Sequence, residues 1–162
     1  MLYLYYYDSP VGKLGIIETG QKITGVFFKD GKKTPKPDDS LIIEETPLIK
    51  KTATQFKEYF GGIRKTFDIP LMPKGTAFQK SVWKALLKIP YGQTRSYRET
   101  AAMAGNPKAC RAAGMANNRN PIAIIIPCHR VIGADGSLTG YGGGLDKKQY
   151  LLELEGAQFK KP

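Results

Sequence analysis

Cysteine and histidine are scarce in this 162-residue chain, which has two cysteines, Cys110 and Cys128, and a single histidine, His129. A structural zinc site takes four such ligands, so the chain cannot assemble one by itself. The glycine-rich stretch at 140–144 is not followed by the lysine and hydroxyl residue of a phosphate-binding loop. We therefore expect no metal, no cofactor and no nucleotide site.

Long apolar runs are also missing. No segment approaches the roughly 20 apolar residues that cross a bilayer, and the opening stretch Met1–Tyr5 is too short and too polar for a signal peptide. We expect an intracellular protein that makes no membrane contact. Its place would be the cytoplasm or the nucleoid, or the nucleus if the source is a eukaryote.

Acidic residues are outnumbered, with 14 Asp and Glu against 25 Lys and Arg and a net charge of +11. Residues 1–75 hold 12 basic and 9 acidic side chains, whereas residues 76–162 hold 13 and 5. Most of the excess positive charge therefore lies in the C-terminal half. A lysine-rich solvated surface explains it equally well on charge alone, but with the motifs below a polyanionic partner is the better interpretation.

The N-terminal part has the pattern of an α+β domain. Three stretches rich in aromatic and β-branched residues, 2–7, 13–19 and 22–28, predict an antiparallel meander. A solvated loop is expected through Pro35, Pro37 and Asp39. Thr46 and Pro47 then have the pattern of a helix N-terminus, and the helix is expected to end at Gly61-Gly62. Nothing in this part indicates chemistry.

Prolines and a glycine at 70–75 mark the boundary, which predicts one domain over residues 1–72 and another over 76–157. The second domain has two capping boxes, Thr76 with Gln79 and Ser96 with Glu99. Each predicts a helix that begins after its N-cap, and the helix after Ser96 is expected over 97–104. Asn106-Pro107 predicts a third helix, from Pro107 to about Ala116, and the close pair forms a helix-turn-helix pattern. A last helix is expected over 146–155.

The second helix of that pattern is rich in alanine and glycine, including Ala112 and Gly114. These small residues either pack against a neighbouring helix or let the helix approach a phosphate backbone or a shallow groove closely. Few of them have side chains able to probe base edges. Cys110 in the same segment is expected to be a packing residue.

The stretch Ile124–Val131 holds the most reactive group of the chain. Its β-branched residues predict a buried strand that presents Cys128, His129 and Arg130 at its end. Most lone cysteines are small buried hydrophobes. A cysteine beside a histidine and an arginine is instead a candidate nucleophile, with His129 taking its proton through a water because neighbours on a strand point to opposite faces.

The motif Pro127-Cys128-His129-Arg130-Val131 resembles the active-site motif of the O6-alkylguanine-DNA alkyltransferases. An Arg-Ala-Ala-Gly run opens 17 residues upstream at Arg111, Asn120-Pro121 lies between, and Tyr97 and Tyr141 fall where the family has tyrosines. The match covers roughly residues 76–157. It implies an N-terminal ribonuclease H-like sheet with a helix and a C-terminal winged helix-turn-helix alkyltransferase domain.

The resemblance also implies an activity. The protein would flip out O6-alkylguanine from double-stranded DNA and transfer the alkyl group irreversibly to Cys128, once per molecule. Whether O4-alkylthymine is also a substrate stays open. It would act as a monomer. The preference between methyl and larger groups, and the role of the N-terminal domain, stay open.

Roles for single residues follow from the same resemblance. In the chemistry, His129 would be the base, Glu155 would orient it, Tyr97 would donate to the guanine N3, and Asn120 would tie the recognition-helix segment to the active-site strand. Arg111 would fill the gap in the base stack. The other implied DNA contacts are Tyr97, Ala112, Gly114 and Arg130, and the implied pocket residues are Pro127, Tyr141, Gly142, Gly143 and Lys148. Gly142 departs from the family, several members of which have a serine there, so the contact to O6 would come from backbone N–H groups.

Three other interpretations compete. A non-enzymatic relative that recognises alkyl damage would lack the cysteine, which is present. A winged-helix transcription factor would explain the charge and the helix-turn-helix but would leave the Cys-His-Arg motif as packing, and sequence-specific operator binding would support it. A thiol hydrolase would turn over many times.

Overall fold

The computed structural model describes residues 1–35 and 40–162 and divides the chain into two compact units. Met1–Lys74 with Pro121–Ala123 form the first, here the N-terminal unit, and Gly75–Asn120 with Ile124–Pro162 form the C-terminal unit. The loop expected at Pro37 and Asp39 lies outside the described residues. Within the described ranges, no helix combines the length and apolarity that a membrane span requires.

The N-terminal unit is a four-stranded sheet in the order β3-β2-β1-β4. The predicted meander is confirmed as β1 (Leu2–Tyr7), β2 (Leu14–Thr19) and β3 (Lys22–Phe28), paired antiparallel. The sheet is not purely antiparallel, because the unpredicted β4 (Leu41–Ile43) runs parallel to β1. Three residues are too few for an alternating pattern to reveal a strand.

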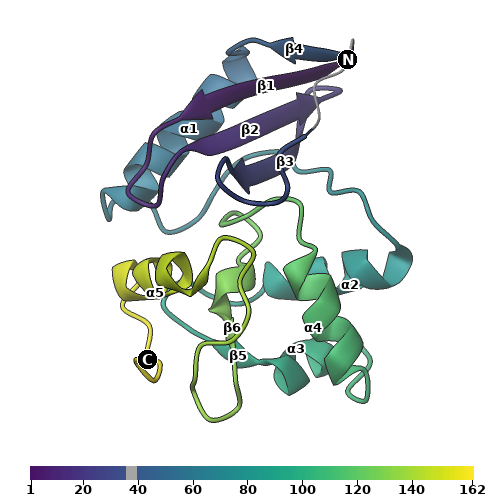
Figure 1. Cartoon of the computed structure of the whole chain (residues 1–162). Helices are drawn as coiled ribbons and strands as arrows, with labels where there is room; N and C mark the ends of the chain where they lie inside the picture. The colour runs from purple at the N-terminus through teal and green to yellow at the C-terminus, as the bar shows by residue number, and fades with distance from the viewer. Residues whose placement is uncertain (36–39) are drawn as a thin grey trace. The chain divides into compact units, whose positions relative to one another are not determined.

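One helix covers this sheet. In α1 (Pro47–Phe60) the Thr46 hydroxyl accepts from the Ile49 N–H, as the N-cap pattern predicts. Figure 1 shows α1 along one face of the sheet, where Ile49, Phe56 and Tyr59 are buried with the inward side chains of the strands. The short segment 121–123 joins this unit through β3, since the Val26 N–H donates to the Pro121 carbonyl.

The C-terminal unit is mainly helical. Both capping boxes are formed, at the starts of α2 (Ala77–Leu86) and α3 (Tyr97–Met103). A two-stranded parallel sheet pairs β5 (Arg95–Ser96) with β6 (Val131–Ile132). The last helix, α5 (Leu145–Leu154), has Glu155 as its C-cap, followed by Gly156 with φ 71°. Helices α2, α3 and α4 (Cys110–Asn118) pack against one another, and the Trp83 Nε1–H of α2 donates to the Ala116 carbonyl of α4 at 2.8 Å.

Two predictions for this unit were wrong in detail. Helix α4 begins at Cys110 rather than Pro107, because Gly105, with φ 90°, ends α3 and the Ala109 N–H closes a turn on the Asn106 carbonyl. The segment 124–126 is not a strand: Ile124 has φ 70°, a left-handed conformation that is rare for a β-branched residue and incompatible with a strand. Cys128–Arg130 instead form one 3-10 turn, η1.

Candidate active site

Cys128 is presented by a tight turn. Pro127 has φ −82° and ψ 66°, the conformation of an inverse γ-turn, and the Cys128 N–H donates to the Ile126 carbonyl at 2.8 Å. The side-chain amide of Asn120 donates to the same carbonyl at 2.7 Å. Because Pro127 has no N–H and fixes its own φ, the sequence favours this turn over continued strand pairing.

The thiol itself is almost enclosed, since Cys128 is 7% exposed. Its backbone carbonyl accepts a 3.4 Å hydrogen bond from Asn117, which sequence reasoning missed. The signal was available: Asn117 is a polar residue one turn before Asn120 on the buried side of an alanine-rich helix. Cys110 is half-buried at the start of α4, and neither cysteine is in a disulfide.

Three buried charged or titratable side chains, two of them directly after Cys128 in the sequence, are joined by hydrogen bonds. The His129 Nε2 lies 2.7 Å from the Glu155 Oε2, and Glu155 accepts from Arg130 through both oxygens, Nε to Oε1 at 2.8 Å and Nη2 to Oε2 at 3.0 Å. The remaining Arg130 nitrogen, Nη1, donates to the Ile89 carbonyl at 2.7 Å. The Arg130 guanidinium also lies 5.8 Å from the centre of the Tyr91 ring.

Arg130 is more buried than its expected contact with DNA suggests. Arg130 was expected at the DNA interface, but it is 8% exposed and its guanidinium is held by a carboxylate and a carbonyl of its own unit. Its partner Glu155 is 25 residues away, so sequence adjacency to Cys128 gave no sign of the pairing. We therefore treat Arg130 as a positioning residue.

Burial and pairing set the charges of this group. Burial lowers the pKa of His129 and outweighs the hydrogen bond and the charge of Glu155, which raise it, so the ring is neutral at neutral pH. Burial also disfavours ionised Glu155. The hydrogen bond from His129 and the bidentate Arg130 guanidinium overcome that effect and hold the pKa of Glu155 well below its usual range.

A neutral His129 with its Nε2–H given to Glu155 has the lone pair on Nδ1. That nitrogen is buried and makes no hydrogen bond to any residue that the structure describes. The carboxylate thus fixes the tautomer and leaves Nδ1 as the proton-accepting atom. The sequence predicts that His129 takes the Cys128 proton through a bridging water, which would be bound at this atom.

Lys148 is also more buried than its expected place among the pocket residues suggests. It was placed among the pocket residues, yet its side chain is buried and its Nζ donates to the carbonyls of Val131 at 2.6 Å and Thr139 at 2.7 Å. Burial lowers the pKa of Lys148 to about 8, a shift that negative charge on Cys128 opposes. Lys148 therefore joins β6 to the loop that precedes α5 rather than standing open to a ligand.

Tyr97 is held by that same loop. Its hydroxyl donates to the Thr139 carbonyl at 3.1 Å and accepts from the Thr139 hydroxyl at 2.9 Å. Burial raises the pKa of Tyr97, so the group stays protonated and able to donate. Sequence reasoning did not find Thr139, which no motif marked.

The glycine loop follows Thr139. Burial raises the pKa of Tyr141, whose hydroxyl is enclosed, and Gly142 and Gly143 fill the turn that the Gly144 N–H closes on the Tyr141 carbonyl at 2.9 Å. A Cβ added at Gly142 would meet no atom within 4 Å. Lack of space therefore does not explain why this chain has a glycine where several family members have a serine.

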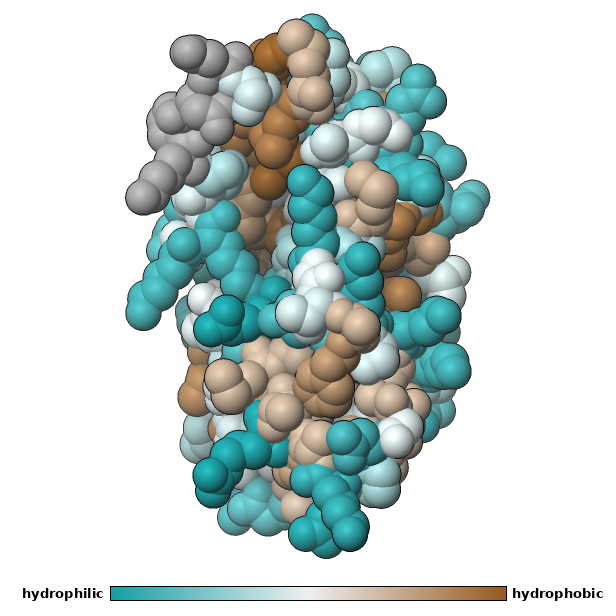
Figure 2. All heavy atoms as spheres, turned by 90° about the vertical axis from the view of Figure 1, so that its right-hand side faces the viewer, coloured by the Kyte–Doolittle hydropathy of each residue, from teal (hydrophilic) through white to brown (hydrophobic). Residues whose placement is uncertain are grey.

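Helix α4 divides its small residues between two sides. Ala113 and Ala116 are buried, while Arg111 and Ala112 are exposed with Met115, which is 60% exposed. The buried alanines therefore pack inside the C-terminal unit, and approach of the exposed side to a phosphate backbone or a groove stays a prediction. The lower half of Figure 2, on the side where Figure 1 places α2 and α4, shows pale brown apolar atoms bordered by teal hydrophilic ones.

Gly114 is half-buried and lies between the buried and the exposed sides of α4. A Cβ built there would come within 3.4 Å of the Tyr97 ring. That close approach lets α4 pack against the side chain that the glycine loop also holds. Arg111 makes no ion pair with any of the residues described, so its guanidinium is available to a phosphate or a base stack.

The pKa directions predict acid sensitivity. His129 is neutral when folded, so the unfolded chain binds more protons below about pH 6.5, and the free energy of unfolding should fall by up to about 1.4 kcal/mol per pH unit there. Glu155, with a depressed folded pKa, adds stability above about pH 4.5 that is lost as the pH falls further. Urea unfolding between pH 7.5 and 5 should show this slope, and His129→Gln should lack it. Equal slopes for the two proteins would contradict the assignment.

Comparison with known proteins now places this site. The model of the DNA-binding domain of 6-O-methylguanine DNA methyltransferase matches residues 77–157, and that of its ribonuclease-like domain matches residues 2–73. The chain belongs to the 6-O-methylguanine DNA methyltransferase family. The α+β fold of a sheet domain followed by a helical one is that of the family.

Individual relatives agree over nearly the whole chain. The methylated-DNA–protein-cysteine methyltransferase of Methanosarcina mazei is 56% identical over 161 residues, which cover 98% of this chain and 100% of the relative. The constitutive enzyme of Bacillus subtilis is 45% identical, over 95% of each chain. Among crystal structures, the Mycobacterium tuberculosis O6-methylguanine methyltransferase matches with a TM-score of 0.85 and 46% identity, covering 96% of this chain and 93% of that one. A structure of the M. tuberculosis protein in complex with DNA matches with a TM-score of 0.84 and 47% identity, covering 95% and 92%.

Proposed function

We propose that this protein repairs double-stranded DNA by taking the alkyl group of O6-alkylguanine onto the Sγ of its own Cys128. The observation that carries the proposal is the buried His129, the residue after Cys128, whose Nε2 contacts Glu155 and whose Nδ1 makes no hydrogen bond to any described residue. A histidine so held suits a base that acts once on a neighbouring cysteine. DNA as the partner agrees with the basic C-terminal half, and the proposal includes a location in the cytoplasm or nucleoid, or in a nucleus.

The reaction balances as a single displacement. The Cys128 proton passes through a water to the His129 Nδ1, and the thiolate then attacks the alkyl carbon. The S–C bond forms while the C–O6 bond breaks, and the electron pair of that bond moves into the guanine. The Tyr97 hydroxyl, which donates to the Thr139 carbonyl in this structure, turns its proton to the guanine N3 as this charge develops. The guanine leaves neutral with that proton, and the tyrosinate regains one from water.

The glycine loop and the γ-turn form the pocket in this proposal. Pro127 and the backbone of Gly142 and Gly143 line it with Tyr141, and the buried Lys148 Nζ holds the loop in place through the Thr139 carbonyl. Asn120 and Asn117 tie the C-terminal end of α4 to the turn at Cys128. The same proposal assigns residues 76–157 to the alkyltransferase domain and residues 1–72 to a separate domain.

An alkyl thioether is not readily hydrolysed by water, because a thiolate is a poor leaving group from an alkyl carbon, so each molecule should act once. The test is to mix the protein with a molar excess of duplex DNA that contains O6-methylguanine and to count the methyl groups removed. Removal should stop at one per protein. A plateau that keeps rising with time would favour a hydrolase, and no removal would favour a protein that only binds damage. An O4-methylthymine duplex in parallel would settle the breadth of the substrate range.

Arg111 provides a prediction on duplex DNA. The target base must leave the stack at a cost of a few kcal/mol, and the exposed Arg111 of α4 is proposed to fill the gap. Arg111→Ala should slow transfer from duplex DNA by about 10- to 100-fold but transfer from free O6-benzylguanine by less than about twofold. Single-turnover rates on both substrates give the ratio.

Arg119, exposed at the C-terminal end of α4, is the matched control for loss of one positive charge. Arg119→Ala should lower DNA affinity slightly without changing the ratio between the two substrates. Equal losses on both substrates for Arg111→Ala would place Arg111 in the chemistry or the fold instead.

Alkylation should weaken the fold. A new methyl group on the 7% exposed Cys128 must fit beside the γ-turn and against α4. Overpacking a tight site costs about 1–3 kcal/mol, which for a chain of this size lowers the melting temperature by roughly 3–10 °C. Thermal unfolding of free, methylated and benzylated protein, with protein exposed to undamaged DNA as the control, should show midpoints in falling order. An unchanged or higher midpoint would show that the pocket has room to spare.

A further inference from the structure

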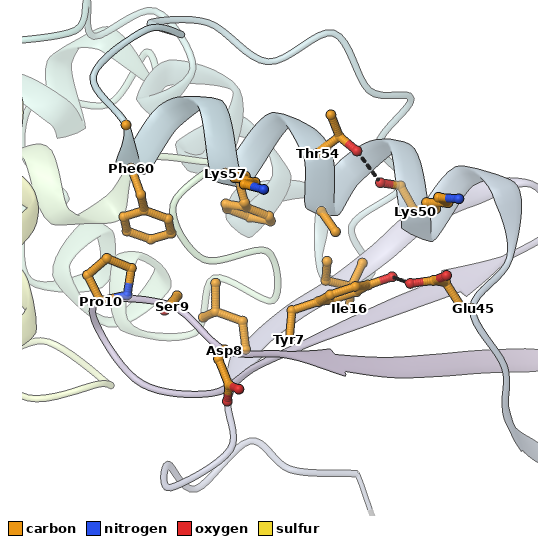
Figure 3. A pocket seen from close by; sticks show the side chains of 14 residues that line it. Tyr7, Asp8, Ser9, Pro10, Ile16, Glu45, Lys50, Thr54, Lys57 and Phe60 are labelled. Carbon is orange, nitrogen blue, oxygen red and sulfur yellow. Dashed lines mark hydrogen bonds between the residues drawn. The ribbon is translucent and has the colours of Figure 1, made fainter.

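The N-terminal unit has a pocket that the proposed function does not use. It lies between α1 and the residues that follow β1, as Figure 3 shows, and has a volume of about 680 Å³. Small-molecule sites commonly have volumes of about 300–1,000 Å³. Every residue that lines this pocket belongs to the N-terminal unit.

The inner surface of the pocket is apolar and firmly packed. Buried core residues of β2 and α1 contribute to it, and two half-buried residues of α1 extend it. These side chains are Leu14, Ile16, Ala53, Phe56 and Phe60. Figure 3 shows Phe60 and Pro10 opposite each other at one end. An apolar ligand body would therefore meet a preformed surface.

The acidic groups of the pocket already have partners. Asp8 lies 3.3 Å from the ammonium of Lys13, and the Tyr7 hydroxyl donates to the Glu45 carboxylate at 2.5 Å. Burial and the hydrogen bond to Glu45 raise the pKa of Tyr7, so this hydroxyl remains a donor. The ion pair with Lys13 offsets the charge of Asp8, whereas Glu45 keeps its negative charge because a neutral hydroxyl does not cancel it.

The basic groups have no such partners. Lys50 and Lys57 are exposed, line the same side of the pocket two turns apart on α1, and form no ion pair with any residue in the described ranges. In Figure 3 both lie on the α1 side with Thr54, across from Tyr7 and Asp8. Counted with Lys13, the rim holds three lysines against Asp8 and Glu45, a net charge of +1, and the two lysines without a carboxylate partner lie on the α1 side.

We propose that this pocket binds a small anionic amphiphile, a molecule with an apolar body and a single carboxylate or comparable anionic head. The body lies on the surface formed by Ile16, Phe56 and their neighbours, and the head lies near Lys50 and Lys57. An acidic peptide shares part of this chemistry. The volume, that of a small-molecule site, favours the smaller ligand, so the peptide becomes an outcome of the test.

The test uses the full chain and octanoate as the probe, with affinity measured by titration calorimetry. Lys50→Glu with Lys57→Glu should weaken octanoate binding by about tenfold, because two attractions become repulsions. The charge-matched control is Lys22→Glu with Lys51→Glu, two exposed residues outside the pocket, which should change affinity by less than about twofold. Ala53→Phe, which fills the pocket without changing its charge, should abolish octanoate binding.

Neutral and cationic analogues of octanoate separate the contribution of the anionic head to affinity from that of the apolar tail. 1-Octanol and octyltrimethylammonium should bind much more weakly than octanoate. Equal binding of all three, equal losses in the control variant, or no octanoate binding would overturn the proposal. So would an acidic peptide that binds where octanoate does not. The inference is independent of the proposed function, because Lys50→Glu with Lys57→Glu should leave the alkyl transfer rate unchanged.

Discussion

Cys128→Ser should abolish alkyl transfer while DNA containing O6-methylguanine is still bound. A serine hydroxyl is nearly the same size as the thiol but stays protonated and is a far weaker nucleophile. Loss of the nucleophile in a covalent catalyst lowers the rate by more than about four orders of magnitude. Single-turnover transfer and DNA affinity, measured on the same preparation, separate chemistry from binding.

Cys110→Ser is the matched control, since Cys110 is the only other thiol and is half-buried at the start of α4. It should retain transfer at close to the original rate. Transfer that survives Cys128→Ser, with the alkyl group on another residue, would contradict the assignment of the acceptor. A parallel loss of DNA affinity would point to a structural role for Cys128.

Glu155→Gln should have the largest combined effect on activity and stability. The substitution leaves the buried Arg130 guanidinium without its carboxylate and removes the group that fixes the His129 tautomer. An uncompensated buried charge costs about 3–5 kcal/mol, and a misdirected general base lowers the rate by about 10²- to 10⁴-fold. Melting temperature and single-turnover rate measure the two effects.

Two further variants make the result specific. Glu153→Gln, on the exposed side of α5, removes a carboxylate from the same helix and should change neither quantity appreciably. Arg130→Met combined with Glu155→Gln removes both charges and should recover much of the stability but little of the activity. If the double variant recovered activity as well, the carboxylate would have no part in the chemistry.

Local signals predicted the elements that depend on neighbouring residues. The capping boxes at Thr76 and Ser96 fixed the starts of α2 and α3, because each box is completed within one helical turn. The run Ile124–Ile126 misled, since a short apolar β-branched run before a proline has the same pattern whether it forms a strand or a buried irregular segment. Only the tertiary environment distinguishes them, here through Asn120 and the Ile126 carbonyl.

The candidate site likewise has residues that the sequence reveals and residues that only the tertiary structure reveals. The motif at Cys128 was visible in the sequence, and the resemblance added Glu155, which does lie against His129. The roles of Arg130 and Lys148 depend on which carboxylate and which carbonyls come close in space, and sequence adjacency does not determine that. Asn117 and Thr139 were missed because a lone polar residue near a helix or a loop has many uses.

The measurement that tests the central claim most directly is the mass of the intact protein after incubation with duplex DNA containing O6-methylguanine, followed by peptide mapping. The account predicts a gain of one methyl group per molecule, found on the peptide that contains Cys128, with the DNA restored to guanine in equal amount. Repaired DNA in excess of the protein without any gain in mass, or a methyl group on any other residue, would contradict it.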